Sequence, residues 1–428
     1  MPRILFISPF ILPTGVTSES TVNAKLVVAG LRAGWEVDII GEDRGRIPWY
    51  PDDIPLHNEL AGITSLISVS RVPSMRHFLL RMESQVLCRG ILSLYGNAWV
   101  SLAIRKGLEL VRSKKYDFIM SRALPEYAHL PALILSRKTG VPWIANWNDP
   151  APLRLLPPPY GDGPFGRPPG GRIMSSLRHQ SLQRFFSTVS GEAIWHTFPC
   201  ERLRKYMRNI LGNEMFDKSS IVPHIAMESK RQNCVSLPVF SLCYAGSMLK
   251  RSPKVFLEGV RRFIDSNHPK ERISVLFLGE HFDAVRESAL TLGLDGLVQI
   301  EKGVAYKDAM KRIEMCTVAL LIEAQMQEGI FLPSKIIDYI QVGRPVLAIS
   351  PLDGTISDLI RKYGGGVVAD CFSPESVANA IGLLYSSWRK GTLDHEYGSW
   401  RLLSQFSSGH VIGLYNQLFH LVLQRKHV

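Results

Sequence analysis

Apolar and polar positions alternate along this chain in a way that predicts repeated strand–helix units. Short apolar runs, such as 4–8, 117–120 and 318–322, have the length and content of buried strands. Longer stretches with apolar residues at helical spacing, such as 20–33 and 253–266, lie between runs of this kind. Because strands that alternate with helices form parallel sheets covered by helices, the pattern predicts an α/β protein.

The same alternation continues through both halves of the chain. In the first half we expect further helices at 126–139 and 201–210, and further strands at 36–40, 141–145, 188–190 and 219–224. In the second half we expect helices at 306–315, 334–339 and 374–385, and strands at 240–246, 273–278, 298–300, 346–349 and 366–368. The tail, 410–424, is again apolar at helical spacing.

Two irregular segments interrupt this pattern. Residues 156–171 are rich in proline and glycine and predict an exposed, mobile loop, whereas 227–237 are polar and predict a linker. A chain of 428 residues is long for a single hydrophobic core. We therefore predict two doubly wound, Rossmann-like domains that face a central cleft, with ligands bound beyond the carboxyl ends of the strands.

Composition limits the class of protein. A hydrophobic content of 46% with 21% charged residues is typical of a folded chain and not of a disordered one. The six cysteines are widely spaced and form no Cys-x-x-Cys pair, which indicates neither a zinc site nor a disulfide framework. No signal peptide and no run of 18 apolar residues stands out, so we expect a cytoplasmic protein without a membrane span.

The net charge of +12 favours an anionic partner, such as nucleic acid, anionic lipid or a phosphorylated substrate. Basic and apolar residues are interleaved from Arg71 to Arg89, which resembles a helix that lies on an anionic membrane surface. The alternative is a helix packed on its own domain with a solvated basic face. The sequence contains no recognisable nucleic-acid-binding module, and we expect no nucleic-acid partner.

The most informative segment is a short predicted helix that begins after Pro333. Gly343 lies where a left-handed helix cap is expected. Ser334 and Lys335 fall at the helix N-terminus, and Asp338 shares a face with Lys335. A helix N-terminus beside a lysine suits a diphosphate, and a carboxylate one turn later suits the two hydroxyls of a sugar. The alternative is a capped surface helix with a salt bridge.

Two loops that follow predicted strands are further candidates. Residues 244–251 carry Gly246, Lys250 and Arg251, a combination that lets the backbone approach a phosphate and neutralises its charge. The alternative is a tight turn with solvated cations. The equivalent loop of the first half contains Gly15 but is neither a P-loop nor Gly-x-Gly-x-x-Gly. This argues against an NTPase and against a nicotinamide-dependent enzyme.

Two residues of the first half are candidates for contact with a second substrate. Asp149 follows a predicted strand, where it is placed to touch a substrate hydroxyl or act as a base, or else to cap a helix. His129 falls within a predicted helix, where it is either a site residue or a core histidine. The sequence offers no paired-histidine or clustered-carboxylate metal motif and no Gly-x-Ser-x-Gly elbow.

Together these segments resemble the nucleotide-sugar glycosyltransferases of the GT-B fold, in particular the large retaining family 4. Members of its polysaccharide-assembly branch carry a similar Pro-Ser-Lys-x-x-Glu-Tyr and Gly-x-Pro-Val pattern. The likeness spans nearly the whole chain and is carried by 333–339, 343–348, 141–144, 149–150, 188–190, 221–223, 244–246, 298–300 and 303–304.

The resemblance implies a role for each domain. Residues 1–230 would form the acceptor-side domain, 231–395 the donor domain, and 396–428 a helical tail that packs back on the first. Asp338 would hydrogen-bond the donor ribose, and Gly15 would let its loop close over the donor. The remaining expected donor-binding residues are Gly246, Lys250, Arg251, Gly303, Val304, Ser334 and Lys335. The expected catalytic residues are His129 and Asp149, on the acceptor side, and Lys335.

The implied activity is transfer of a sugar from a nucleotide-diphosphate donor to a glycan or lipid-linked acceptor, with retention and without a metal or other cofactor. This chain departs from the family at Asp338, which is one methylene shorter than the usual glutamate, and at Ile330, where the family often has another glutamate. Two alternatives therefore stay open: a GT-B-like sugar-nucleotide 2-epimerase, and a non-catalytic nucleotide-sugar-binding assembly partner. A peripheral position at the inner membrane face is a further expectation.

Overall fold

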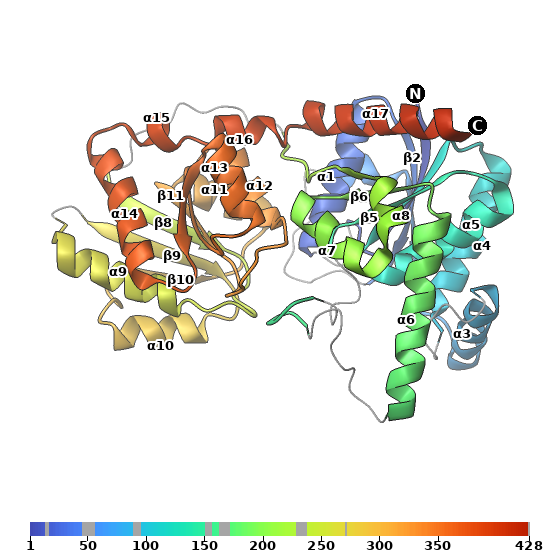
Figure 1. The fold of residues 1–428 in the computed structure, drawn as a ribbon, viewed down its shortest axis with the longest axis horizontal. Coiled ribbons are helices and arrows are strands. Elements are labelled where there is room, and N and C mark those ends of the chain that lie inside the picture. Colours follow the sequence, from blue (N-terminus) through green and yellow to red (C-terminus); the bar gives the residue numbers. More distant parts are fainter. Residues whose placement is uncertain are drawn as a thin grey trace. The chain divides into compact units, whose positions relative to one another are not determined.

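The computed structural model describes residues 1–12, 17–44, 56–88, 96–149, 156–161, 172–227, 238–269 and 272–426. The chain divides into two compact units (Figure 1). Unit 1 comprises Met1–Pro223 and Val411–Val428, and unit 2 comprises His224–His410. Gly15, Arg89, most of the predicted linker and most of the proline-rich loop lie outside the described residues.

Unit 1 is built on a parallel sheet of seven strands in the order β3-β2-β1-β4-β5-β6-β7. The strands are β1 (Arg3–Ile7), β2 (Glu36–Glu42), β3 (Thr64–Ile67), β4 (Phe118–Ala123), β5 (Trp143–Trp147), β6 (Trp195–Phe198) and β7 (Ser219–Ile221). All residues of β4 and β5 are buried, as expected for central strands covered on both faces.

Helices connect these strands and cover the sheet. They are α1 (Ser18–Arg32), α2 (His57–Ala61), α3 (Ser74–Leu87), α4 (Ala98–Ser113), the 3-10 turn η1 (Glu126–Ala128), α5 (His129–Thr139), α6 (Arg172–Glu192), α7 (Glu201–Leu211) and α8 (Asn213–Asp217). The first of them, α1, begins with a reciprocal capping box between Thr17 and Ser20.

Unit 2 repeats the doubly wound plan with six parallel strands in the order β10-β9-β8-β11-β12-β13. The strands are β8 (Phe240–Ala245), β9 (Ile273–Gly279), β10 (Val298–Lys302), β11 (Val318–Ile322), β12 (Val346–Ser350) and β13 (Gly366–Asp370). The helices are α9 (Lys254–Asn267), α10 (Asp283–Thr291), α11 (Tyr306–Glu314), α12 (Ser334–Gln341), α13 (Thr355–Tyr363), α14 (Pro374–Arg389), α15 (Leu393–Tyr397) and α16 (Trp400–Ser404).

The last helix, α17 (Ser408–Lys426), returns the chain to unit 1 (Figure 1). Tyr415 and Phe419 pack edge-on against Trp35, with ring centroids 5.6 and 5.2 Å from it. Phe419 also stacks on Phe118 of β4 at 4.7 Å. The indole N–H of Trp35 donates to the Asn416 side chain at 3.2 Å. The core of unit 1 therefore includes the end of the chain.

One predicted element is wrong. We expected a strand at 188–190, but these residues lie in the last turns of α6, and the strand is β6, at Trp195–Phe198. Thr188 and Val189 are β-branched, which favours a strand locally. Phe185 and Val189, four residues apart, are both buried, so packing along one helix face overrides that local preference.

Candidate functional site

The reversal of strand order in each sheet marks where a ligand is expected. In unit 2 the chain adds β9 and β10 on one side of β8, and then returns to add β11, β12 and β13 on its other side. The loops that leave β8 and β11 therefore separate above the sheet and open a crevice at its carboxyl edge. In unit 1 the equivalent reversal lies between β1 and β4.

In unit 2 this crevice contains Lys335, at the start of α12. Pro333 has an extended conformation and cannot continue a helix backward, so α12 begins at Ser334. The ammonium group of Lys335 donates to the Tyr244 hydroxyl at 2.7 Å and lies 3.9 Å from the centre of its ring. Burial and then the charge of Arg251 lower the pKa of Lys335 well below its ordinary value, while Asp338 opposes them.

Three glycines leave the backbone beside Lys335 without side chains of its own. Gly246 follows β8 with a φ of +114°, and a Cβ there would lie 2.8 Å from the end of the Lys335 side chain. Gly279, at the end of β9, has a φ of +143°, and its Cβ would lie 2.4 Å from the Gly246 carbonyl oxygen. Gly303 lies beside Gly279, with 3.7 Å between its ideal Cβ and the Gly279 Cα. The three glycines form a continuous backbone surface, here called the glycine shelf.

Tyrosine hydroxyls fix α12 against its neighbours. The Tyr306 hydroxyl, at the start of α11, donates to the Asp338 carboxylate at 2.6 Å. The backbone N–H of Ala245, at the end of β8, donates to the Tyr339 hydroxyl at 3.1 Å. Lys335 and Asp338 thus have separate hydrogen-bond partners although they share a helix face. This tethering holds Lys335 beside Gly246.

A buried carboxyl group lies on the other side of the reversal. Glu323 directly follows β11, is 8% exposed, and accepts a hydrogen bond from the hydroxyl of Ser350, the last residue of β12. Burial raises the pKa of Glu323 to about 7, while the Ser350 hydrogen bond and the charge of Arg251 oppose the shift. Glu323 therefore titrates near neutral pH.

This part of unit 2, here called the cationic corner, is defined by Tyr244, Gly246, Arg251, Glu323 and Lys335. It combines two cationic side chains, an exposed backbone and a helix N-terminus at one place. Such a combination binds a phosphate group, because fixed positive charge and backbone N–H groups stabilise the anion. A phosphate would also supply the negative charge that Lys335 lacks when the corner is empty.

Unit 1 carries a different polar cluster at its own reversal. The guanidinium of Arg122, on β4, donates to the Asn148 side-chain oxygen at 2.7 Å and to the Tyr415 hydroxyl at 3.4 Å. Asn148, just after β5, donates in turn to the Glu19 carboxylate in the first turn of α1. Arg122 and Asn148 are 3% and 5% exposed. Glu19, Arg122, Asn148 and Asp149 are here called the carboxyl corner.

The two acids of the carboxyl corner are displaced from their ordinary protonation range. Burial raises the pKa of Glu19 to about 8; Asp149 adds to the shift, whereas Arg122 opposes it. Burial also raises the pKa of Asp149 to about 6. Both acids therefore hold protons more readily than free carboxylates do, so each can either donate to or accept from a neighbouring group near neutral pH. This chemistry suits an uncharged hydroxyl.

The structure places His129 in the core, as the core-histidine alternative expects. Its ring is fully buried, its Nδ1 lies 2.7 Å from the Ser121 hydroxyl, and its centroid is 4.3 Å from that of Trp147. Burial, and secondarily the charge of His196, lower the pKa of His129 to about 3. The ring is therefore neutral, and it contacts Ser121 of β4 and Trp147 of β5.

The sequence-predicted donor residues differ in how close the structure places them to the cationic corner. Gly246, Ser334 and Lys335 lie in or beside the cationic corner, and Gly303 adjoins Gly246 through the glycine shelf. Val304 follows Gly303 and is 37% exposed. The side chain of Lys250 is exposed, and its φ is +61°. Sequence reasoning gave no role to Tyr306, Glu323 and Ser350, although Glu323 and Ser350 stand at strand ends, the signal that singled out Asp149.

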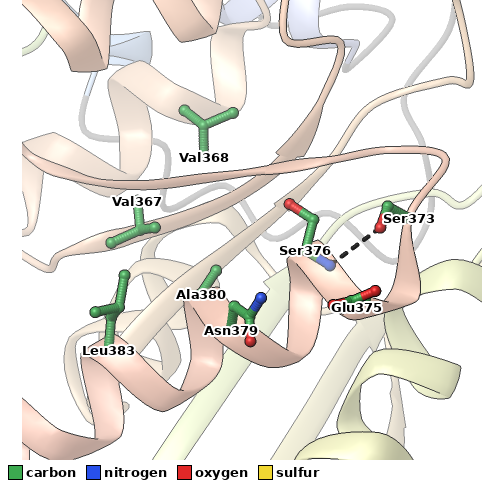
Figure 2. A pocket seen from close by; sticks show the side chains of 8 residues that line it. All are labelled: Val367, Val368, Ser373, Glu375, Ser376, Asn379, Ala380 and Leu383. Atoms are coloured by element: carbon green, nitrogen blue, oxygen red, sulfur yellow. Dashed lines mark hydrogen bonds between the residues drawn. The ribbon is translucent and has the colours of Figure 1, made fainter.

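One hollow of about 380 Å³ lies away from the cationic corner, between β13 and α14 (Figure 2). Val367, Ala380 and Leu383 point into it, and Glu375 is its only charged lining residue. At its rim the Ser373 hydroxyl caps α14 by accepting from the Ser376 N–H at 3.1 Å. Without a cation in its lining, this hollow does not suit a diphosphate.

Among the residues that the structure describes, no group of three or more histidine, cysteine, aspartate or glutamate side chains is arranged to hold a metal ion.

No family model and no curated protein sequence matches the chain. Solved structures do match it in fold. HepE of Anabaena, in complex with UDP-glucose, superposes with a TM-score of 0.64 at 13% identity, covering 99% of this chain and 100% of that one. A mutant of S. aureus TarM, in complex with UDP, fondaparinux and α-GlcNAc-glycerol, gives 0.61 at 10% identity, covering 98% and 100%.

A Listeria monocytogenes protein, named provisionally as a UDP-N-acetylglucosamine 2-epimerase, gives a TM-score of 0.56 at 10% identity, covering 97% of this chain and 96% of that one. Such identities establish the fold alone. The chain has the GT-B fold, with two doubly wound α/β units, as the sequence predicted.

Proposed function

We propose that this chain is a glycosyltransferase that moves a sugar from a nucleotide-diphosphate donor to a glycan or lipid-linked acceptor. The observation that carries the proposal is the cationic corner, where Lys335 lies against Tyr244 and Gly246 at a strand-order reversal. The likeness in fold to HepE, solved with UDP-glucose, supports it. The resemblance of the segment around Ser334 to family-4 glycosyltransferases also supports it.

In this proposal the donor lies along unit 2. Lys335 and Arg251 would face the diphosphate. The nucleoside would extend along the glycine shelf toward Gly303 and Val304, where its base would bind. Asp338, oriented by Tyr306 at 2.6 Å, would accept from the ribose hydroxyls. The shorter reach of Asp338 relative to a glutamate is offset here by its fixed orientation.

The proposed chemistry follows from the leaving group. As the glycosidic bond breaks, negative charge develops on the departing diphosphate, and fixed cations with the α12 N-terminus stabilise that charge. We propose that these groups take the part of a metal ion. We also propose that configuration is retained, with the departing phosphate oxygen receiving the proton of the incoming hydroxyl. The carboxyl corner would orient that hydroxyl through Asp149.

The test is calorimetric titration of the full chain with UDP, GDP and their common sugar conjugates, followed by product analysis. Binding of one nucleotide sugar, and release of its nucleotide only when an acceptor is present, is the expected result. Turnover unchanged by EDTA would support the metal-independent chemistry. Absence of binding across the whole panel would refute the proposal.

The likeness to the Listeria epimerase-type structure favours one second candidate, a sugar-nucleotide 2-epimerase. An epimerase interconverts donors without any acceptor. Incubation with the bound nucleotide sugar alone therefore separates the two: a new sugar nucleotide indicates epimerisation, whereas unchanged donor agrees with transfer. Binding without turnover over a broad acceptor panel would instead favour a non-catalytic assembly partner.

A further inference from the structure

Helix α3 presents a stripe of large apolar side chains to solvent. Its members, here called the α3 stripe, are 50–74% exposed: Met75, Phe78, Leu79, Met82 and Val86. Their spacing of three or four residues places them on one side of the helix. Elsewhere in the described part of the chain, exposed large apolar side chains occur singly or, on α17, as the pair Leu421 and Leu423. The α3 stripe is thus unlike the rest of the surface.

The opposite side of α3 is already packed. Leu80 and Ser84 are buried against α4. The Ser101 hydroxyl of α4 donates to the Leu80 carbonyl at 2.8 Å, and the backbone N–H of Asn97 donates to the Ser84 hydroxyl at 2.9 Å. Helix α3 is therefore held on unit 1 by the face opposite the α3 stripe (Figure 1).

Basic residues flank the α3 stripe. At 100° per residue, Arg76 falls on one edge of it and Arg81 on the other. Arg71, just before the helix, has a side chain that is 83% exposed and lies 3.8 Å from the Asp43 carboxylate. The acidic residue of the helix, Glu83, is paired with Arg105 of α4 at 2.9 Å. The apolar centre is thus bordered by net positive charge.

We propose that the α3 stripe docks on an anionic lipid bilayer, with its apolar side chains among the acyl chains and its arginines at the headgroups. An apolar centre with a cationic border fits such a surface. A second copy of the chain fits less well, because a two-fold contact would bring the arginine borders together. Within the described residues no helix is long and apolar enough to cross a bilayer, so the contact is peripheral.

The test is co-sedimentation of the full chain with phosphatidylcholine vesicles, with and without about 30 mol% phosphatidylglycerol. We expect binding to the anionic vesicles and about tenfold less to the neutral ones. Exchanging Phe78, Leu79 and Met82 for serine should lower the anionic partition coefficient about tenfold or more. The charge variant Arg71→Gln/Arg76→Gln should lower it several-fold.

Matched variants on the surface of unit 2 provide the controls. Leu290, Met315 and Leu352 are exposed apolar residues in unrelated places, and their exchange for serine should leave binding unchanged. Arg262→Gln/Lys362→Gln is the control for charge. Vesicle-dependent protection of 74–87 from hydrogen exchange in the wild-type chain gives a readout that needs no variant. Nucleotide affinity should not differ between any of these chains, which separates this test from that of the sugar-transfer proposal.

Three outcomes would overturn the inference. The first is wild-type chain that fails to bind anionic vesicles. The second is an unchanged partition coefficient in the Phe78, Leu79 and Met82 variant, or equal binding to neutral vesicles. The third is a vesicle-free dimer that this variant abolishes, which would assign the stripe to a second copy of the chain instead.

Discussion

The cationic corner of unit 2 and the carboxyl corner of unit 1 occupy equivalent places in two similar sheets, yet their ionisable side chains differ. In unit 2, burial and then the charge of Arg251 lower the pKa of Lys335. In unit 1, burial raises the pKa of Glu19 to about 8 and of Asp149 to about 6. The same fold thus holds a buried lysine with a lowered pKa in unit 2 and two buried acids with raised pKa values in unit 1.

The difference shows how one repeated fold can carry two kinds of polar site. In the cationic corner the lowered pKa of Lys335 reflects burial and a neighbouring cation, and an anion such as a diphosphate would offset both. A carboxyl corner that is already close to neutral needs no counter-ion, which suits a hydroxyl. Variants of four residues test this contrast.

Lys335→Ala should weaken nucleotide-diphosphate binding about 100-fold, because it removes a charge-assisted contact to phosphate. Lys362 is a matched control, since its ammonium group also lies near a tyrosine ring, that of Tyr363, at 4.9 Å, but away from the glycine shelf. Lys362→Ala should bind normally by calorimetry. Equal affinities for the two variants would remove the basis of the cationic corner.

Asp149→Asn should reduce kcat/KM for transfer about 30-fold while leaving donor affinity within about twofold, because it alters the hydroxyl-binding side only. Since the pKa of Asp149 is about 6, wild-type transfer should also decline as the pH falls through 6 and the carboxylate is protonated. The variant should lack this limb of the pH profile. Asp217→Asn, at an exposed position, is the control. A fall in donor affinity that matched the fall in rate would contradict the division between the corners.

Gly246→Ala should weaken donor binding about tenfold, since its Cβ would displace the Lys335 ammonium group. Gly293→Ala separates backbone strain from crowding, because Gly293 also has a positive φ, +64°, but nothing lies within 4 Å of its ideal Cβ. Both variants should lose about 1 kcal/mol of unfolding free energy in urea titrations. Only the first should lose affinity; a similar loss in both would assign the effect to strain.

Glu323→Gln should change the pH dependence of donor binding by a few-fold only. With its pKa near 7, Glu323 is mostly neutral at pH 6 and mostly ionised at pH 8, where it competes with the diphosphate for Arg251. Wild-type affinity should therefore fall about threefold between pH 6 and pH 8. The glutamine variant should lack this fall, as calorimetry at the two pH values would measure. A slope identical to wild type would exclude Glu323.

The sequence sufficed for the α/β class, the doubly wound plan and the start of α12. Gly343 has the left-handed φ, +78°, expected of a residue after a helix end. Local patterns failed where distant contacts decide. The pairing of Glu323 with Ser350 depends on β11 and β12 being neighbours, which single-strand patterns do not specify.

The α3 segment gives a second instance of this limit. Its sequence has apolar residues on both sides, so periodicity alone does not tell which side is buried. The Ser84 and Ser101 hydrogen bonds decide the matter, and both involve α4. Small polar residues at these positions carry little signal until their partners are known.

The return of α17 to unit 1 sets an order for folding during synthesis. Unit 2 is one continuous stretch, His224–His410, whereas unit 1 is completed by residues 411–428, which leave the ribosome after unit 2. Until Tyr415 emerges, Arg122 lacks its phenolic partner and Trp35 lacks two aromatic neighbours. Domains generally fold as units while the chain is made. Unit 2 can therefore fold on a nascent chain whose unit 1 is still incomplete.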